Sequence, residues 1–356
     1  MAKIRYVLVG FGGIAENRVA KEGYACDRKR FRPLRNAALV GATDLNPARQ
    51  KAAEALGLKW YPSLEAVLAD KSVDGVYIAT NNRSHVPLAM SALKAGKHVI
   101  VEKPIATSVA DAKRLNKLAK AKRLSLTVDH MMVNNAWNIA GKAAMAKGRL
   151  GKVNDCCFHM EFAYGYDPAE AATWRCSKVE EMGGPVGDVA SHCFYVAEYM
   201  FGKRIAKVAA VYYPKTMKIK AEDGAYVKFF FEDGTQGSVN ASFSELRGGL
   251  AGTLTNLGYE IYGDKAALRG YGTLFQLSGY RDEPIAIRLE LDDGKTVKRV
   301  APGKIQNIYQ TLIDGHAKSV RDRKPLTADA AIHNLALCAA VHASAKAGGK
   351  PVAVRD

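Results

Sequence analysis

Short apolar runs alternate with amphipathic segments through the first part of the chain. The runs that are long enough for buried strands lie at 4–9, 38–43, 73–80, 98–102 and 124–128. Between them the polar and apolar positions follow a helical period, and one such segment begins at Asn46-Pro47 and ends before Gly57. Strands that alternate with helices form βαβ units. We therefore predict an α/β domain over 1–128, with a parallel sheet covered by helices on both faces.

The pattern changes after Val128. Asp-Gly turns at 232–235 and 292–295 separate runs that are typical of β-hairpins. A largely antiparallel sheet is expected between 153 and about 300, interrupted by a loop and a helix, and two further helices close the chain. The second predicted domain, over 129–356, is therefore α+β and built on an open, largely antiparallel sheet.

The composition is that of an ordinary globular protein with two domains. The chain has 356 residues, of which 48% are apolar and 24% are charged. No run approaches the roughly eighteen apolar residues of a membrane span, and the apolar run near the N-terminus is too short for a secretory signal. The six cysteines lack C-x-x-C spacing, so we expect neither a disulfide framework nor a zinc site. These features predict a cytoplasmic protein.

The formal net charge of +17 is the unusual feature of the composition. A basic surface attracts nucleic acid, anionic membranes and acidic substrates alike. The densest basic cluster, at 27–35, precedes a predicted strand as a surface insertion, and the basic helix at 111–123 lacks interleaved aromatic residues. We therefore predict a solvated basic surface, with neither nucleic acid nor a membrane as a partner.

A glycine-rich turn directly follows the first predicted strand and opens a helix. Gly10 would permit the tight turn, Gly12 would let the backbone approach a pyrophosphate, and Ala15 would allow the helix to pack closely on the sheet. Free amides at the helix start would attract the phosphates. A glycine turn without a ligand is the alternative, but this position in a βαβ array favours a Rossmann dinucleotide site. The residues assigned to it are Gly10, Phe11, Gly12, Gly13, Ile14 and Ala15.

The second predicted strand ends at Asp44, where a dinucleotide-binding fold places an acid that accepts hydrogen bonds from the adenosine ribose. Its charge would also repel the 2′-phosphate of NADP, so NAD is the expected cofactor in preference to NADP. Two readings stay open. Asp44 could simply cap the following helix, and Arg49 nearby could weaken the discrimination.

Motifs spread over nearly the whole chain resemble those of one oxidoreductase family. After the glycine turn come ATNNRSH at 79–85, EKP at 102–104, Trp174-Arg175, GGPVGDVASH at 183–192 and YGDKAALR at 262–269. In this order and spacing they resemble the Gfo/Idh/MocA family, named for glucose-fructose oxidoreductase, inositol dehydrogenase and rhizopine catabolism. The resemblance implies a Rossmann domain, a second domain for substrate binding and oligomerisation, and a homodimer or homotetramer.

The resemblance also assigns the catalytic residues, because the lysine of EKP and the acid and base of a D-x-x-x-H segment correspond to Lys103, Asp188 and His192. Oxidising an alcohol requires removal of the hydroxyl proton as the hydride leaves, and histidine, with an ordinary pKa near ~6.5, suits that exchange. Asp188 and His192 would share one face of a helix that begins at Gly187, where Asp188 could bind a hydroxyl or orient the imidazole. Lys103 would stabilise charge on the reacting oxygen. A helix cap, a buried histidine and a surface lysine are the structural alternatives.

Weaker candidates complete the predicted site. On the cofactor side they are Thr80, Asn82, His85, Glu102 and Lys103. On the substrate side an aromatic face can pack on a sugar ring and a guanidinium can donate to hydroxyls. The residues assigned there are Lys103, Trp174, Arg175, Asp188 and His192. No third ligand accompanies Asp188 and His192, so no metal is expected, and the run at 130–133 differs from the Arg-Phe pair of many relatives, which leaves the substrate open.

Together these features predict an NAD-dependent oxidoreductase that moves a hydride between the nicotinamide and a hydroxyl-bearing carbon of a sugar, cyclitol or glycoside. Oxidation of a glycoside to its 3-keto form is one version. Two alternatives remain: an NAD-dependent glycosidase that uses transient oxidation and elimination, and a non-catalytic regulator that senses a dinucleotide. Net formation of NADH would distinguish the dehydrogenase from the glycosidase, and absence of turnover would favour the regulator.

Overall fold

The computed structural model describes residues 2–245, 255–274 and 287–356. Among these residues the chain forms two compact units. The first contains the chain up to Met131 together with Gln306–Ile332, and the second contains the described residues between Met132 and Ile305 together with His333–Asp356. The first unit is therefore assembled from two stretches that are distant in sequence.

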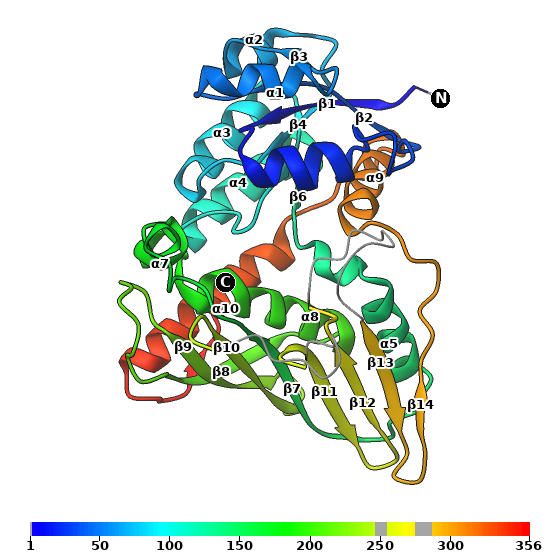
Figure 1. The fold of residues 1–356 in the computed structure, drawn as a ribbon, viewed down its shortest axis with the longest axis vertical. Coiled ribbons are helices and arrows are strands. Elements are labelled where there is room, and N and C mark those ends of the chain that lie inside the picture. Colours follow the sequence, from blue (N-terminus) through cyan, green and yellow to red (C-terminus); the bar gives the residue numbers. More distant parts are fainter. Residues whose placement is uncertain (1, 246–254, 275–286) are drawn as a thin grey trace. The chain divides into compact units, whose positions relative to one another are not determined.

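A parallel six-stranded sheet forms the centre of the first unit (Figure 1). Its order is β3-β2-β1-β4-β5-β6, and every neighbouring pair is parallel. The order reverses between β1 and β4, which is the switch point where such sheets bind ligands. The strands are β1 Ile4–Val9, β2 Ala37–Thr43, β3 Lys59–Trp60, β4 Gly75–Ile78, β5 His98–Val101 and β6 Leu126–Val128. The predicted parallel sheet is confirmed, and only the two-residue β3 was not foreseen.

Helices connect these strands, with ends that follow from local sequence. The side chain of Asn46 accepts a hydrogen bond from Ala48 N at the predicted cap, and that of Ser108 accepts one from Asp111 N. The helices of this unit are the π-helix η1 Ala15–Gly23, the 3₁₀ turn η2 Pro47–Arg49, α1 Gln50–Glu54, α2 Leu64–Ala69, α3 Asn82–Lys94, α4 Val109–Lys122 and α9 Ile308–Arg321.

The helix α9 belongs to the first unit although it lies near the end of the sequence. His316 Nδ1 lies 2.7 Å from the hydroxyl of Tyr6 in β1, and Asn36 N donates to Asp314 Oδ1 at 2.7 Å. The expected division at residue 128 treats the domains as consecutive stretches, whereas the compact units share the last part of the chain. A boundary at residue 128 between a cofactor-binding part and a substrate-binding part of the sequence stays a proposal.

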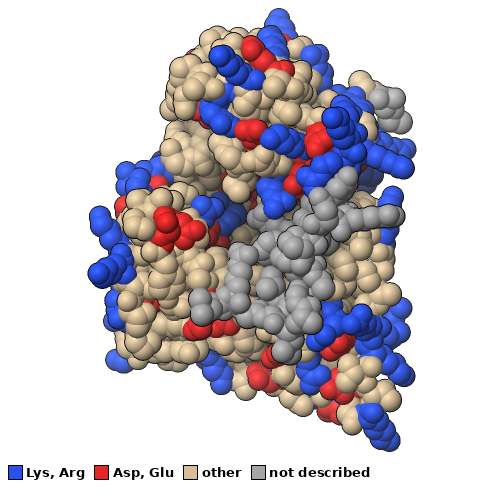
Figure 2. Space-filling view, in the orientation of Figure 1, with Lys and Arg blue, Asp and Glu red and all other residues tan. Residues whose placement is uncertain are grey.

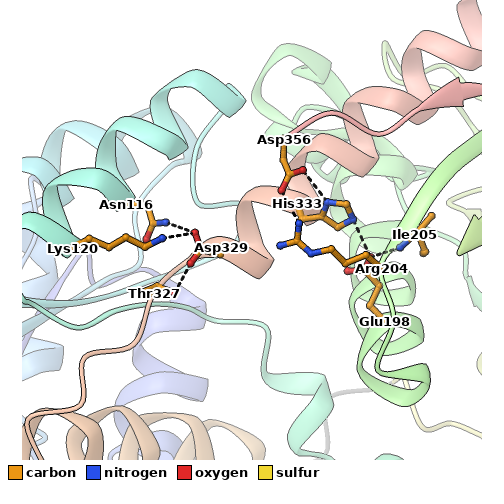
Figure 3. A network of polar contacts seen from close by, with 9 residues as sticks. All are labelled: Asn116, Lys120, Glu198, Arg204, Ile205, Thr327, Asp329, His333 and Asp356. Atoms are coloured by element: carbon orange, nitrogen blue, oxygen red, sulfur yellow. Dashed lines mark hydrogen bonds and ion pairs between the residues drawn. The ribbon is translucent and has the colours of Figure 1, made fainter. Parts of the chain in front are cut away.

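The helix α10 Asp329–Lys346 contains residues of both units, since the division falls after Ile332. At its start, in the first unit, the carboxylate of Asp329 accepts hydrogen bonds at 2.8 Å from both Asn116 and Lys120 (Figure 3). In the second unit His333 lies within ion-pair distance of Glu198, at 3.0 Å, and of Asp356, at 3.4 Å. The charged contacts of Asp329 therefore lie within the first unit, and those of His333, four residues later, lie within the second.

A nine-stranded mixed sheet forms the second unit, in the order β14-β13-β12-β11-β7-β10-β9-β8-β15. All its pairs are antiparallel except β7 with β10. The predicted Asp-Gly hairpins join β9 to β10 and β13 to β14, with Gly234 and Gly294 at positive φ. The strands are β7 Val153–Glu161, β8 Ile205–Tyr212, β9 Gly224–Phe231, β10 Gln236–Ser242, β11 Leu257–Gly263, β12 Ala267–Tyr271, β13 Arg288–Asp292, β14 Val297–Arg299 and β15 Val352–Ala353.

Helices cover one face of this sheet, and within the described parts of the chain no helix covers the other (Figure 1). The covered face buries Phe158, Phe229 and Ile261, whereas Val211 and Tyr226 are about half exposed on the open face. The remaining helical segments are η3 Met131–Asn134, α5 Ala136–Ala146, α6 Pro168–Ala171, α7 Trp174–Ser177, η4 Val179–Glu181, the π-helix η5 Val186–Ala190 and α8 Ser191–Phe201. The predicted largely antiparallel open sheet is confirmed.

Lysine and arginine side chains occur over many parts of the visible surface (Figure 2). In the basic segment at 27–35, Arg28, Lys29 and Arg30 are exposed while Phe31 and Leu34 are buried and anchor the segment. Among the described residues no helix is long and apolar enough to cross a bilayer.

Candidate active site

The glycine turn after β1 has the shape that a dinucleotide requires. Gly10 has φ +87°, and a Cβ there would lie 2.6 Å from Ala79 O, so only glycine fits. Gly12 and Gly13 have no atom within 4 Å of a Cβ position, which leaves open space beside the turn. The first helix starts directly afterwards at Ala15. Open space beside glycines and a helix N-terminus together fit the pyrophosphate of a dinucleotide.

Asp44 holds the glycine turn and the following helix together. Its Oδ2 accepts a hydrogen bond from Phe11 N at 2.6 Å, and its Oδ1 accepts one from Asn46 N at 2.8 Å. Each carboxylate oxygen has two acceptor positions, so both oxygens can still accept a hydroxyl proton. Asp44 therefore caps the following turn and can also accept hydrogen bonds from ribose hydroxyl groups.

Arg49 holds the glycine turn through contacts that the sequence did not indicate. Its Nε donates to Phe11 O at 2.6 Å, and its guanidinium forms an ion pair with Glu16. Glu16 accepts a hydrogen bond from Lys21 and one from Arg49, and both lower the pKa of its carboxyl group. Because the guanidinium is engaged by the protein, Arg49 supports the turn in addition to lying near Asp44.

The turn after β4 is joined to the EKP segment by a buried histidine. Asn81 caps α3 by accepting from Ser84 N at 3.2 Å, and Ser84 Oγ donates to Thr80 Oγ1 at 2.7 Å. His85 is fully buried, with Nδ1 2.8 Å from Pro104 O and Nε2 3.3 Å from Thr80 O. Burial lowers the pKa of His85, which therefore stays neutral. His85 positions both turns, and a contact of Asn82 or His85 with a cofactor stays a prediction.

Glu102 and Lys103 follow the last residue of β5. The backbone N of Glu102 continues the strand by donating to Ile78 O at 2.9 Å. Burial raises the pKa of Glu102, while the neighbouring Lys103 opposes that rise. Since β1, β2, β4 and β5 are parallel neighbours, the glycine turn, Asp44, Thr80 and Lys103 all follow the carboxyl ends of strands at one edge of the sheet.

In the second unit, Asp188 and His192 lie where a π-helix passes into an α-helix. Asp188 belongs to η5 and His192 to the first turn of α8, and their exposed fractions are 7% and 4%. Single π turns of this kind are frequent at functional sites. The segment is held by hydrogen bonds from Val186 N to Glu222 Oε1, at 3.0 Å, and from Asn334 Nδ2 to Ser191 O, at 2.8 Å.

The structure brings Asp188 together with Arg175. Arg175 Nε donates to Asp188 Oδ2 at 3.1 Å, and the guanidinium carbon lies 4.9 Å from the centre of the Trp174 ring. Asp188 raises the pKa of Arg175 further above its ordinary value. The Asp188 carboxylate thus orients the guanidinium, a role that the sequence did not indicate. Trp174, Arg175, Asp188 and His192 all belong to the second unit, and Lys103 belongs to the first.

Replacing Gly12 with alanine tests the turn without disturbing the fold. The added methyl group would have no neighbouring protein atom within 4 Å, and the backbone of Gly12 is not in the left-handed region. We therefore expect the free energy of unfolding to change by less than about 1 kcal/mol. A methyl group at this position would block a pyrophosphate, so the dissociation constant of NADH should rise about tenfold or more in a fluorescence titration. The control is Gly303→Ala, where a methyl group also meets open space. Equal NADH affinity in both variants would contradict a cofactor role for the turn.

Comparison with known proteins agrees with these features. Residues 4–130 match the GFO_IDH_MocA model of an oxidoreductase family with an NAD-binding Rossmann fold, and residues 140–269 match the GFO/IDH/MocA C-terminal domain. The 1,5-anhydro-D-fructose reductase of Ensifer adhaerens is 26% identical over 266 residues, which cover 72% of this chain and 74% of that protein.

Solved structures share the fold over the whole chain. An aldose-aldose oxidoreductase from Caulobacter crescentus, complexed with glycerol, has a TM-score of 0.84 at 20% identity and covers 99% of this chain and 100% of that one. A levoglucosan dehydrogenase in complex with NADH and levoglucosan has a TM-score of 0.81 at 20% identity and covers 100% of both chains. Together with the two domain matches, these similarities show that the chain belongs to the GFO/IDH/MocA family of NAD-binding oxidoreductases.

Proposed function

We propose that the protein is an NAD-dependent dehydrogenase that acts on a hydroxyl-bearing carbon of a sugar, cyclitol or glycoside. One observation carries the proposal. The open glycine turn, Asp44 and Lys103 all lie at the carboxyl edge of one parallel sheet, on either side of its switch point. This arrangement fits a dinucleotide between the glycine turn and Asp44, with Lys103 at the end that carries the chemistry.

The protein side chains would transfer the hydroxyl proton and position the substrate. A bound nicotinamide supplies the hydride acceptor or donor. His192 would take the hydroxyl proton during oxidation and return it during reduction. Lys103 would donate a hydrogen bond to the reacting oxygen and stabilise the negative charge that develops there. Asp188 would hold Arg175 through the 3.1 Å contact, so that the remaining guanidinium N–H groups can donate to substrate hydroxyls.

The polyhydroxylated substrate class rests on the side chains of the second unit and on relatives. Trp174 offers an aromatic face, and Arg175 beside it offers several donors in a fixed plane. The names of the relatives, a 1,5-anhydro-D-fructose reductase and a levoglucosan dehydrogenase, refer to sugars. A sugar, cyclitol or glycoside that combines an apolar ring face with hydroxyl groups is the substrate that these residues suit.

A panel of sugars, cyclitols and glycosides incubated with the protein and NAD tests this function. We expect at least one to produce NADH in proportion to oxidised product, measured by absorbance of the reduced nicotinamide. Cleavage of a glycoside without accumulation of NADH would show a glycosidase instead. Tight NADH binding without turnover of any compound would contradict the dehydrogenase and favour a regulator.

Asp44 supports NAD over NADP, because a carboxylate that faces the ribose repels a 2′-phosphate. We expect Asp44→Ala to reduce the ratio of kcat/KM for NAD to that for NADP by about tenfold or more. Asp44 also holds Phe11 N, so Asp44→Asn, which keeps an oxygen acceptor, separates loss of charge from loss of that contact. Both variants should shift the ratio in the same direction. An unchanged ratio in both would mean that another residue distinguishes the cofactors.

The open face of the nine-stranded sheet supports assembly into a homodimer or homotetramer. Val211 and Tyr226 are exposed by 48% and 52% on neighbouring strands of this face. Exposed apolar surface on a broad sheet is commonly covered by a partner. A copy of the same chain is the partner we propose.

A further inference from the structure

A buried and a partly buried carboxyl group, Asp129 and Glu102, meet at one tyrosine hydroxyl. The hydroxyl of Tyr77, in β4, lies 2.5 Å from Asp129 Oδ2 and 3.1 Å from Glu102 Oε1. Tyr77 and Asp129 have no exposed surface. Glu102 and Asp129 follow the neighbouring strands β5 and β6, so the sheet itself brings the two acids together. We refer to Tyr77, Glu102 and Asp129 as the carboxyl cluster.

The number of protons limits the charge of the carboxyl cluster. A tyrosine hydroxyl has one proton, so it can donate to only one of the two acids at a time. If both acids were ionised, two negative charges would share this buried position with a single donor between them, which is strongly unfavourable. One additional proton on an acid removes that repulsion and supplies a second donor. The geometry therefore calls for one neutral and one ionised carboxyl group.

Asp129 is the acid that suits the proton. Its Oδ1 is buried and has no hydrogen-bond partner among the described residues, which a full carboxylate charge would make costly. Burial, followed by the charge of Glu102, raises the pKa of Asp129 well above its ordinary range. Glu102 is the acid that suits the charge, since Lys103 and the hydrogen bonds that it accepts oppose the rise of its pKa.

The groups around the carboxyl cluster do not supply a competing charge. Tyr24, which follows η1, and Tyr309, in α9, are both buried, and burial raises the pKa of each hydroxyl well above its ordinary value. Burial and the charge of Lys103 lower the pKa of His130 to about 3, so this ring is neutral. Among the described residues, Lys103 at the end of β5 is the cation whose charge lowers the pKa of both acids.

We propose that Asp129 and Glu102 share a single proton, and that Asp129 thereby acts as a positioning residue that keeps one negative charge, not two, next to Lys103. A second charge would draw the ammonium of Lys103 more strongly towards the cluster. No charge at all would remove the attraction between the cluster and this ammonium. The consequence for catalysis rests on the proposed function, whereas the shared proton does not.

Infrared spectroscopy of the intact protein tests the shared proton without any substrate. At neutral pH a protonated carboxyl group has a C=O stretching band separate from those of carboxylates. We expect Asp129→Asn to lose one component of this band, while the exposed Asp155→Asn keeps the wild-type spectrum. Burial also raises the pKa of Glu222, so other components can remain. If Asp129→Asn does not fold, carboxyl-¹³C aspartate in the unmutated chain should move one component. A band that neither the substitution nor the label changes would overturn the proposal.

The pH profile of turnover tests whether the carboxyl cluster holds one negative charge. Asp129→Asn keeps one negative charge, so the basic limb of the kcat/KM profile should stay at the wild-type pH even if the rate falls. Glu102→Gln combined with Asp129→Asn removes that charge and should move the basic limb down by about one pH unit. Equal profiles in the single and double variants would overturn the role assigned to the pair. Failure of every substrate would count against the proposed function and leave the infrared result intact.

Discussion

Replacing His192 with alanine should lower kcat by about a hundredfold or more, because His192 is the group proposed to take the hydroxyl proton in the transition state. The dissociation constant of NADH should stay nearly unchanged, since His192 is not among the residues proposed to bind the cofactor. Steady-state kinetics with NAD and the substrate found in the panel, together with a fluorescence titration of NADH, measure both quantities.

The matched control for this variant is His342→Gln. His342 lies on α10 of the second unit and contacts the hydroxyl of Tyr212 at 2.7 Å, and nothing places it in the candidate site. Its loss should affect kcat far less than that of His192. If both variants retain wild-type turnover, His192 is not the acid-base group.

Replacing Lys103 with methionine should lower kcat/KM by about a hundredfold, because the proposed donor to the reacting oxygen is lost while the length of the side chain is nearly kept. NADH binding should persist if the glycine turn and Asp44 hold the adenosine end. The exposed Lys94→Met, at the end of α3, removes a charge from the same unit and should have little effect. A rise in KM with unchanged kcat would show that Lys103 only binds substrate.

The sheet of the first unit could be predicted because its strands are buried on both faces and appear as continuous apolar runs. All five predicted strands occur, with ends that differ by a few residues, whereas β3 has only two residues and leaves no detectable alternation. The place of α9 could not be predicted. Its packing depends on contacts such as His316 with Tyr6, which are separated by 310 positions.

The motifs of the candidate site could be predicted because they depend on local backbone geometry. Gly10 is an example, since its positive φ and its approach to Ala79 exclude any side chain. The supporting contacts could not be predicted, since each joins residues that are distant in sequence. Tyr77 with Asp129 and Arg175 with Asp188 look like ordinary strand or helix positions until the chain has folded.

We propose, as the central claim, that Lys103 and His192 contribute to one chemical step. Combining Lys103→Met with His192→Ala and measuring kcat/KM for all four proteins tests it directly. When two residues serve the same step, the losses caused by their separate substitutions do not multiply. The kcat/KM of the double variant should therefore fall no more than roughly threefold below that of the worse single variant. Losses that multiply to about ten-thousandfold would show two independent contributions and contradict the claim.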